Sequence, residues 1–256
     1  MSASAEAERG IEAYNQGDYQ TAISIIKPLA EDGVPEAQNC LGHMYFNGNG
    51  VNQDIASAMR WYRKAADQGL ALAQNSLGRM YYYGLVMAQD YEEAAKWYRK
   101  AADQGLADAE NNIGIMYKCG HGVPQDYVEA MKWHRKVADK GIALGQLGVG
   151  NMYYSGLGVE QDYGEAMKWF NMAAEQGLAY AQGILGFMYS SGYGTEQDPV
   201  RACMWFDLAI LRYPASEEQM REKVKTIRNL LVEKMTADQV EQASKLVKEW
   251  KPKTKE

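Results

Sequence analysis

The stretch Trp61-Tyr62-Arg63-Lys64-Ala65-Ala66-Asp67-Gln68-Gly69 returns unchanged, 36 residues later, as Trp97-Tyr98-Arg99-Lys100-Ala101-Ala102-Asp103-Gln104-Gly105. Looser forms of this stretch begin at Trp133, Trp169 and Trp205, so five tryptophans share one period. Self-similarity at a period of about 20–50 residues is typical of solenoids and other repeat arrays. The residues that define such a repeat hold the scaffold together, and they say little about its ligand.

The first half of each repeat predicts an amphipathic helix, here called helix A. Its signature is Leu-Gly-x-Met-Tyr or a close relative, beginning at Leu41, Leu77, Ile113, Val149 and Leu185. The apolar residues of this signature, with a small residue four positions earlier, lie on one face of a helix. A glycine inside a helix costs about 1 kcal/mol. Its return in every repeat therefore predicts close packing against the backbone of a neighbouring helix.

The second half of each repeat predicts a loop and a second helix, here called helix B. Ala58, Trp61, Ala65 and their equivalents form its apolar stripe, so we expect the tryptophan to be buried in every repeat. Each loop carries a glycine that fits the left-handed end of helix A and an aspartate that fits the N-cap of helix B. The glycines are Gly48, Gly84, Gly120, Gly156 and Gly192, and the aspartates are Asp54, Asp90, Asp126, Asp162 and Asp198.

These patterns predict an all-α fold, an α-solenoid of antiparallel helical hairpins with about 14 helices. The five repeats occupy residues 35–70, 71–106, 107–142, 143–178 and 179–214. Residues 1–34 are expected to form a degenerate N-terminal capping hairpin, and residues 215–256 a two-helix C-terminal cap. Ser216-x-x-Gln219 and Thr236-x-x-Gln239 are capping-box patterns, each of which predicts a helix start in the C-terminal cap.

The repeat, read as L-G-x-M-Y…G-x-G-V-x-Q-D-Y-x-x-A-x-x-W-Y-x-K-A-A-x-Q-G, resembles the sel-one-like (SLR) repeat, a relative of the tetratricopeptide repeat. Val86, which replaces the second loop glycine, is among its mild departures from the family pattern. The resemblance implies that the α-solenoid is a right-handed superhelix, and that the protein is a bacterial scaffold or adaptor that takes part in protein complexes. Many bacterial members are exported, which slightly favours the periplasm or secretion over the cytoplasm, although the chain begins without a signal peptide.

Charge and composition argue against several classes of partner. Residues 1–210 hold 16 basic and 25 acidic side chains, and an acidic solenoid is a poor candidate for nucleic-acid binding. No apolar run approaches the roughly 20 residues that a membrane-spanning helix needs. Cys40, Cys119 and Cys203 lie in different repeats at different columns, which favours free thiols and predicts no metal site. We expect no cofactor, and the oligomeric state stays open.

An enzymatic function finds little support in the sequence. Ser24-Ile25-Ile26-Lys27 matches the Ser-x-x-Lys motif of penicillin-recognising hydrolases, but the companion Ser-Asp-Asn and Lys-Thr-Gly motifs are missing. One such match is close to what chance gives in a chain of this composition. A hydrolase of that type is therefore kept only as a remote alternative.

The favoured function is a scaffold that binds an extended peptide or protein segment in a concave groove. Residues of helix A outside the packing stripe face this groove in tetratricopeptide-type stacks, and asparagine amides there can pair with both backbone groups of an extended peptide. A carboxylate is the preferred anchor, because the groove columns hold the cations Arg79 and Lys118. The predicted peptide-binding residues are Asn39, His43, Asn75, Arg79, Tyr82, Asn111, Lys118, Asn151 and Tyr154. The alternative is a structural spacer that assembles a larger complex through its caps or convex face.

Overall fold

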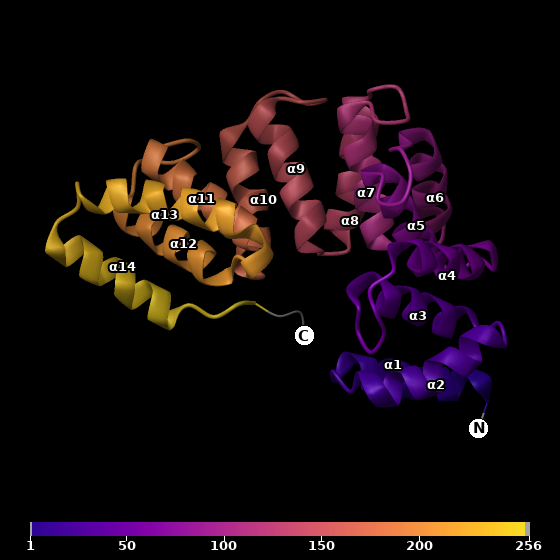
Figure 1. Ribbon diagram of the computed structural model, residues 1–256. Coiled ribbons are helices and arrows are strands. Elements are labelled where there is room, and N and C mark those ends of the chain that lie inside the picture. The colour runs from indigo at the N-terminus through magenta and orange to yellow at the C-terminus, as the bar shows by residue number, and fades with distance from the viewer. Residues whose placement is uncertain (1, 254–256) are drawn as a thin grey trace. The chain divides into compact units, whose positions relative to one another are not determined.

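The computed structural model describes residues 2–253, which are built from α-helices (Figure 1). Within these residues there are 14 α-helices and one short 3₁₀ turn, with no β-strand. Within each unit most helices pack against the next one along the chain, and the predicted all-α repeat fold is confirmed. The chain divides into two compact units, Met1–Asp126 and Tyr127–Glu256, and the division falls between the two helices of the third repeat. Each unit is described by itself.

Unit 1 consists of three helical hairpins followed by a single helix A. Each helix packs against the next one along the chain, and α1 also reaches α3. The N-terminal hairpin buries Ala22 and Ile26 in the same core as Leu41 and Met44 of the first repeat. The helices are α1 (Ala3–Asn15), α2 (Tyr19–Glu31), α3 (Pro35–Asn47), α4 (Ile55–Asp67), α5 (Ala71–Tyr83), α6 (Tyr91–Asp103) and α7 (Ala107–Cys119).

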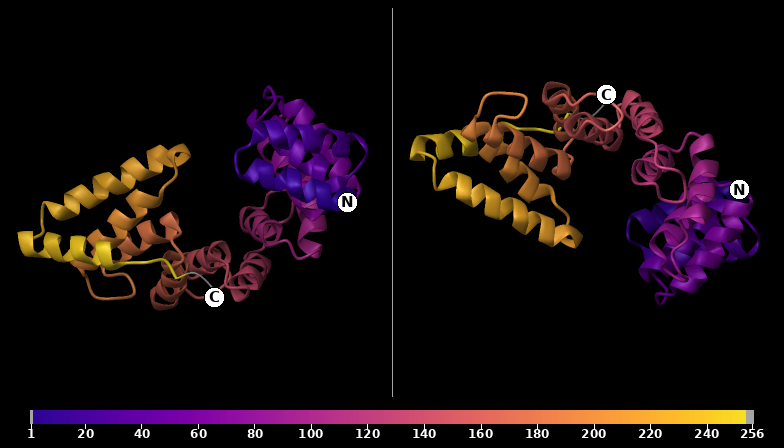
Figure 2. Two further views of the ribbon diagram at one scale, coloured as in Figure 1. Left: turned by 90° about the horizontal axis from the view of Figure 1, so that it is seen from below. Right: turned by 90° about the horizontal axis from the view of Figure 1, so that it is seen from above.

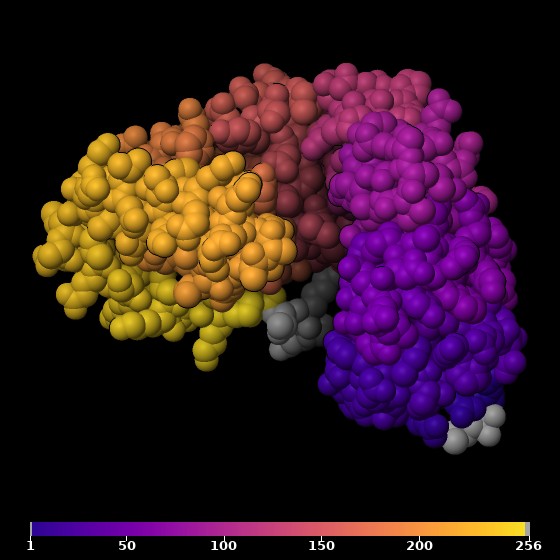
Figure 3. All heavy atoms as spheres, in the orientation of Figure 1, coloured from indigo at the N-terminus to yellow at the C-terminus, as the bar shows by residue number. Residues whose placement is uncertain are grey.

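Unit 2 begins with a helix B and ends with the two C-terminal helices. Its helices are α8 (Tyr127–Asp139), α9 (Ala143–Ser155), α10 (Tyr163–Glu175), α11 (Ala179–Ser191), α12 (Pro199–Arg212), α13 (Glu218–Val232) and α14 (Ala237–Glu249). Both α13 and α14 pack against α12, and they diverge from the turn that joins them (Figure 2). In the space-filling view they cover much of the visible face of this unit (Figure 3). A capping role for residues 215–256 stays a prediction.

One of the two predicted capping boxes exists. The Thr236 hydroxyl accepts from the Gln239 N–H at 3.2 Å, and the Gln239 side chain accepts from the Thr236 N–H at 2.9 Å. The prediction for Ser216 was wrong, because the chain first makes a 3₁₀ turn over Ala215–Glu217 and α13 begins only at Glu218. The extended residue that a cap requires is Pro214, which has no side-chain hydrogen-bonding group.

The loops between helices A and B take the predicted form. Gly48 and its four equivalents all have positive φ, between 62° and 76°, and end helix A in the left-handed conformation. Asp54, Asp90, Asp162 and Asp198 each accept a hydrogen bond from the backbone N–H three residues later, at 2.9–3.0 Å. The repeat loops are therefore held by backbone geometry and capping bonds, which favours a structural role for these glycines and aspartates.

The glycine of helix A packs against an aromatic ring, and the predicted contact with a neighbouring helix backbone was wrong. A Cβ on Gly42 would lie 2.6 Å from the Tyr62 ring, and one on Gly150 would lie 2.6 Å from the Phe170 ring. Both rings belong to helix B of the same repeat, at the position directly after the tryptophan. The absent side chain therefore makes room for a ring that locks the hairpin together.

The residue after the tryptophan is a core residue of helix B in every repeat. Its exposure is at most 2 % in every repeat, at Tyr62, Tyr98, His134, Phe170 and Phe206. The prediction that the tryptophan is buried in every repeat holds for Trp97 and Trp205, while Trp61, Trp133 and Trp169 are only half-buried. At Gly42 and Gly150 the ring beside the tryptophan fills the space over the helix A glycine, so the half-buried indoles of Trp61 and Trp169 lie at the margin of the core.

Cationic side chains cover the indoles at that margin. The Lys64 ammonium lies 4.2 Å from the Trp61 ring centroid, and the Arg135 guanidinium lies 4.7 Å from that of Trp169. A cation over an exposed aromatic ring contributes about 0.5–1 kcal/mol. The Arg-Lys pair that follows the tryptophan in the opening stretch therefore has a structural use.

A ladder of glutamines joins neighbouring repeats through their buried polar atoms. The Gln74 amide donates to the Ala66 carbonyl at 3.2 Å and accepts from Gln104 at 2.8 Å. Gln38 makes the same two bonds with Ala30 and Gln68. Because buried polar groups are costly unless paired, the ladder fixes the register of one hairpin on the next. This accounts for the recurring Gln-Gly at the end of helix B.

Candidate functional site

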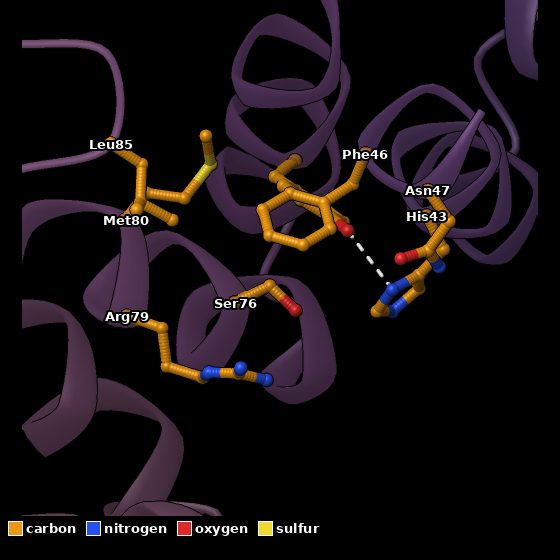
Figure 4. Close-up of a pocket in the computed structure, with 8 residues that line it drawn as sticks. His43, Phe46, Asn47, Ser76, Arg79, Met80 and Leu85 are labelled. Atoms are coloured by element: carbon orange, nitrogen blue, oxygen red, sulfur yellow. Dashed lines mark hydrogen bonds between the residues drawn. The ribbon is translucent and has the colours of Figure 1, made fainter. Parts of the chain in front are cut away.

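A pocket of about 200 Å³ lies in unit 1 between the A helices of the first two repeats. We call it the polar pocket. Viewed closely, the Phe46 ring has Met80 and Leu85 on one side and His43 on the other, while Ser76 and Arg79 extend from α5 (Figure 4). Its lining comprises His43, Phe46 and Asn47 of α3, Tyr62 of α4, Ser76, Arg79 and Met80 of α5, and Leu85 of the following loop.

Arg79 supplies the charge of the polar pocket. His43 Nδ1 lies 2.9 Å from the Tyr62 hydroxyl oxygen. Burial, and then the nearby Arg79 guanidinium, lower the pKa of His43 below its usual value, so the imidazole is neutral at neutral pH. Arg79 is exposed, and no carboxylate within residues 2–253 forms an ion pair with it. The pocket therefore holds an uncompensated cation, which suits an anionic ligand.

The asparagine column that was predicted to bind a peptide backbone is mostly buried. Asn39 is 8 % exposed and Asn111 is 9 % exposed, so each offers little amide surface to a ligand. Asn75 is half-buried, and its side-chain oxygen accepts from the Asn112 amide at 3.1 Å. The structure thus leaves Asn75 as the most accessible of the three. Their use in binding stays a prediction.

The other predicted residues of unit 1 lie outside the polar pocket. Tyr82 lines a small cavity of about 50 Å³ with Tyr83, Tyr98 and others, and its hydroxyl oxygen lies 3.0 Å from His121 Nδ1. The half-buried Lys118 is absent from the lining of both spaces, and its carbonyl accepts from the Gln125 side chain. The structure therefore brings His43 and Arg79 together, but it does not bring Arg79 and Lys118 into one pocket.

Unit 2 has a larger pocket, of about 300 Å³, which we call the aromatic pocket. It contains the predicted residues Asn151 and Tyr154. Its other lining residues are Phe170 of α10, Tyr180, Gly183, Ile184 and Phe187 of α11, Phe206 of α12, Tyr213, and Met220, Val224 and Ile227 of α13. None of these side chains carries a charge at neutral pH, in contrast to the lining of the polar pocket.

Several lining residues were not among the predicted site residues. Phe46 and Ser76 lie on helices A, and neither carries the charge or amide group that marks the predicted site residues around them. Tyr62 adjoins the apolar stripe of helix B, which indicates a core residue. Leu85 lies in the loop after helix A, where the repeat pattern indicates only a turn. The pocket depends on side chains from three helices and a loop, and no local pattern brings them together.

Ser24 of the Ser-x-x-Lys match lies on α2 of the N-terminal hairpin. The Ser24 hydroxyl donates to the Thr21 carbonyl within α2, which is an ordinary local bond of a helical serine. Among residues 2–253, His, Cys, Asp and Glu side chains do not gather in threes or more in a way that could hold a metal ion. No helix in the same range combines the length and apolarity needed to cross a membrane.

The Sel1 repeat family model matches residues 35–70, 71–106, 107–142, 143–178 and 179–212. The crystal structure of a Sel1 repeat protein from Oxalobacter formigenes is 36 % identical, covers 80 % of this chain and 81 % of that one, and has a TM-score of 0.73. The protective antigen c5321 of uropathogenic Escherichia coli, which displays an SLR fold, is 29 % identical, covers 97 % of this chain and 61 % of that one, and has a TM-score of 0.57.

A putative Sel1 repeat protein from Klebsiella pneumoniae has the same fold, with 21 % identity, a TM-score of 0.54, and coverage of 78 % of this chain and 97 % of that one. No curated protein matches the chain. The Sel1 repeat fold is generally a protein–protein interaction scaffold and typically non-catalytic. With five matched repeats over residues 35–212, this chain belongs to the Sel1 repeat family.

Proposed function

We propose that this scaffold binds a protein segment that places a carboxylate in the polar pocket of unit 1. The observation that carries the proposal is Arg79, an exposed arginine of the pocket that has no carboxylate partner within residues 2–253. A guanidinium donates two parallel hydrogen bonds to a carboxylate, and charge-assisted bonds of this kind are about twice as strong as neutral ones. Ser76 and Asn47 supply further hydrogen-bonding groups in the same lining.

The walls of the pocket support a polypeptide as the ligand rather than a free acid. Phe46, Met80 and Leu85 present apolar surface beside the cation. A small anion gains nothing from such surface, whereas a peptide can bury the side chain next to its carboxylate against it. Asn75 and Tyr82, on the same helix as Arg79, remain predicted contacts for the rest of the segment.

Short synthetic peptides test this proposal by fluorescence polarisation. One peptide ends in Gly-Leu-Leu with a free α-carboxylate, a second has the same sequence with an amidated end, and a third is amidated but carries an internal Leu-Asp. The first and second distinguish carboxylate recognition from general stickiness. The third shows whether a side-chain carboxylate serves as well as a chain end.

We expect Arg79→Gln to weaken binding of the carboxylate peptides about 10–100-fold, because a hydrogen bond to a charged group contributes about 1.5–3 kcal/mol. Arg60→Gln is the matched control, since Arg60 is an exposed arginine of unit 1 whose guanidinium is bound to Ser57. Equal affinity of wild type and Arg79→Gln for all three peptides would overturn the proposal. The spacer function would then become the better explanation of the fold.

A further inference from the structure

The loop after α5 departs from the repeat at a position where glycine has a defined task. In four loops the second glycine has positive φ, at Gly50, Gly122, Gly158 and Gly194. Each of these lies against the backbone carbonyl of the first residue in the second helix of the preceding hairpin. A Cβ would come within 2.8 Å of the Tyr19 oxygen at Gly50 and within 2.4 Å of the Tyr163 oxygen at Gly194. These loops can approach the backbone of the preceding hairpin so closely only because the glycine has no side chain.

Val86 occupies this position in the second repeat and cannot do the same. Its Cβ would collide with the carbonyl beneath, and a β-branched residue with positive φ is strongly disfavoured. No residue other than glycine has positive φ within residues 2–253. The start of the loop is also tighter, because a Cβ on Gly84 would lie 2.8 Å from the Gln89 nitrogen, whereas at Gly48 the nearest atom is the Gln53 Cβ at 3.3 Å.

The changed loop presents three consecutive apolar side chains to solvent. Leu85 is 42 % exposed, Val86 42 % and Met87 46 %. The valine equivalent to Met87 is half-buried in the first, third and fourth repeats, at Val51, Val123 and Val159. Exposure of three adjacent apolar residues is costly to a soluble scaffold, and such patches commonly mark a surface that binds a partner. We call residues 85–87 the apolar lip.

The apolar lip borders the proposed carboxylate site, because Leu85 lines the polar pocket with Arg79. We propose that the lip is a specificity element which selects a partner segment with an aliphatic or aromatic side chain next to the carboxylate. The cation and the lip are then two halves of one recognition site, one reading charge and the other reading the adjacent side chain. Met87 suits this role, since its flexible thioether adapts to apolar surfaces of different shape. This inference rests on the proposed function.

The test compares two peptides that share a free α-carboxylate and differ beside it, one ending in Gly-Leu-Leu and the other in Gly-Ser-Ser. We expect the wild-type protein to bind the leucine peptide about tenfold more tightly, because it buries an aliphatic side chain at the lip. A lip variant combines Leu85→Ser, Val86→Gly and Met87→Ser. It should bind the two peptides with affinities within about threefold of each other. Its affinity for the serine peptide should equal that of the wild-type protein.

Val123→Ser is the matched control, because Val123 holds the position of Met87 in another repeat. Circular dichroism should show the same helix content in all variants. If the lip variant keeps the full preference for the leucine peptide, the proposed role of the lip is wrong. If Arg79→Gln still loses binding in that case, the proposed carboxylate site remains supported. Failure of both peptides to bind wild-type protein overturns the proposed function and the lip together.

Discussion

The polar pocket of unit 1 and the aromatic pocket of unit 2 occupy the same positions of the repeat, three repeats apart, and have opposite chemistry. His43, Tyr62 and Arg79 of the first correspond to Asn151, Phe170 and Phe187 of the second. Ser76 likewise corresponds to Ile184. The backbone frame of capped helices and glycine contacts is common to both. The repeat consensus therefore builds the frame of each pocket, and the variable columns of helix A set the chemistry of its lining.

The ends of the two pockets also differ. Leu85 of the apolar lip borders the polar pocket, whereas Met220, Val224 and Ile227 of the chain's own α13 line the aromatic pocket. A Cβ on Gly183 would lie 3.6 Å from Val224, so the asparagine column has become a contact for α13 in the fifth repeat. The apolar side of the amphipathic helix α13 thus packs on the surface that the sequence assigned to a ligand. The two pockets therefore have equivalent helices A and B but are closed at one end by different elements, a loop in unit 1 and α13 in unit 2.

The largest effect concerns the floor of each pocket, which is the buried ring that follows the tryptophan, Tyr62 in the polar pocket and Phe170 in the aromatic pocket. Phe170→Ala should lower the free energy of unfolding by about 3–5 kcal/mol, because it empties a fully buried aromatic site against Gly150. The neighbouring Trp169→Ala is the matched control and should cost clearly less, since that indole is half-buried. Urea unfolding of the two variants measures the difference. A larger loss from Trp169→Ala would show that the tryptophan is the true core residue.

A charge placed in the aromatic pocket should abolish its distinction from the polar pocket. We expect a neutral apolar fluorophore such as N-phenyl-1-naphthylamine to bind the aromatic pocket and to lose about tenfold in affinity in Phe187→Arg, because a charge resists desolvation. Phe187 is 41 % exposed, so the arginine can reach water without disrupting the fold. Arg79→Gln should leave dye binding unchanged. An unaltered titration in Phe187→Arg would place the dye elsewhere.

In the polar pocket the hydroxyl of the floor residue Tyr62 is hydrogen-bonded to His43, whereas the equivalent Phe170 of the aromatic pocket has no hydroxyl group. Tyr62→Phe makes this floor like that of the aromatic pocket, and it should cost about 1 kcal/mol of stability by removing the bond to His43. His43→Asn introduces the residue found at the equivalent position, Asn151. A double-mutant cycle measures the coupling between the two side chains by chemical denaturation. Fully additive effects would mean that the bond contributes nothing to stability.

The smallest effect is the pH dependence that His43 confers on unit 1. Its pKa is lowered in the folded protein by burial and by Arg79, so the unfolded chain takes up the proton more readily. The stability that the neutral imidazole contributes is complete above the usual histidine pKa of about 6.5 and is lost as the pH falls below it. Wild-type protein should therefore lose more stability than His43→Asn between pH 7.5 and pH 5. Parallel losses in the two proteins would contradict this.

Part of the molecule follows from local sequence alone. The period, the glycine that ends helix A and the aspartate that begins helix B act within a few residues of themselves, so the order and type of the helices can be read directly from the chain. Thr236 and Gln239 show the same locality, because their capping bonds span three residues. Ser216 shows its limit, since the turn after Pro214 moved the helix start past it.

The rest was decided by contacts between distant residues. Periodicity places Trp61 and Tyr62 on adjoining parts of one helix face, and only the approach of Gly42 selects the tyrosine ring as core. The same applies to the candidate site, where Arg79 and Lys118 look equivalent in their columns but have different surroundings. Burial of Asn39 and exposure of residues 85–87 depend on how closely one hairpin approaches another. The sequence by itself determined a Sel1 repeat scaffold, because helix caps and periodicity are local. Only the tertiary structure decided where pockets lie on that scaffold, because a pocket is made by side chains that the chain brings together from separate repeats.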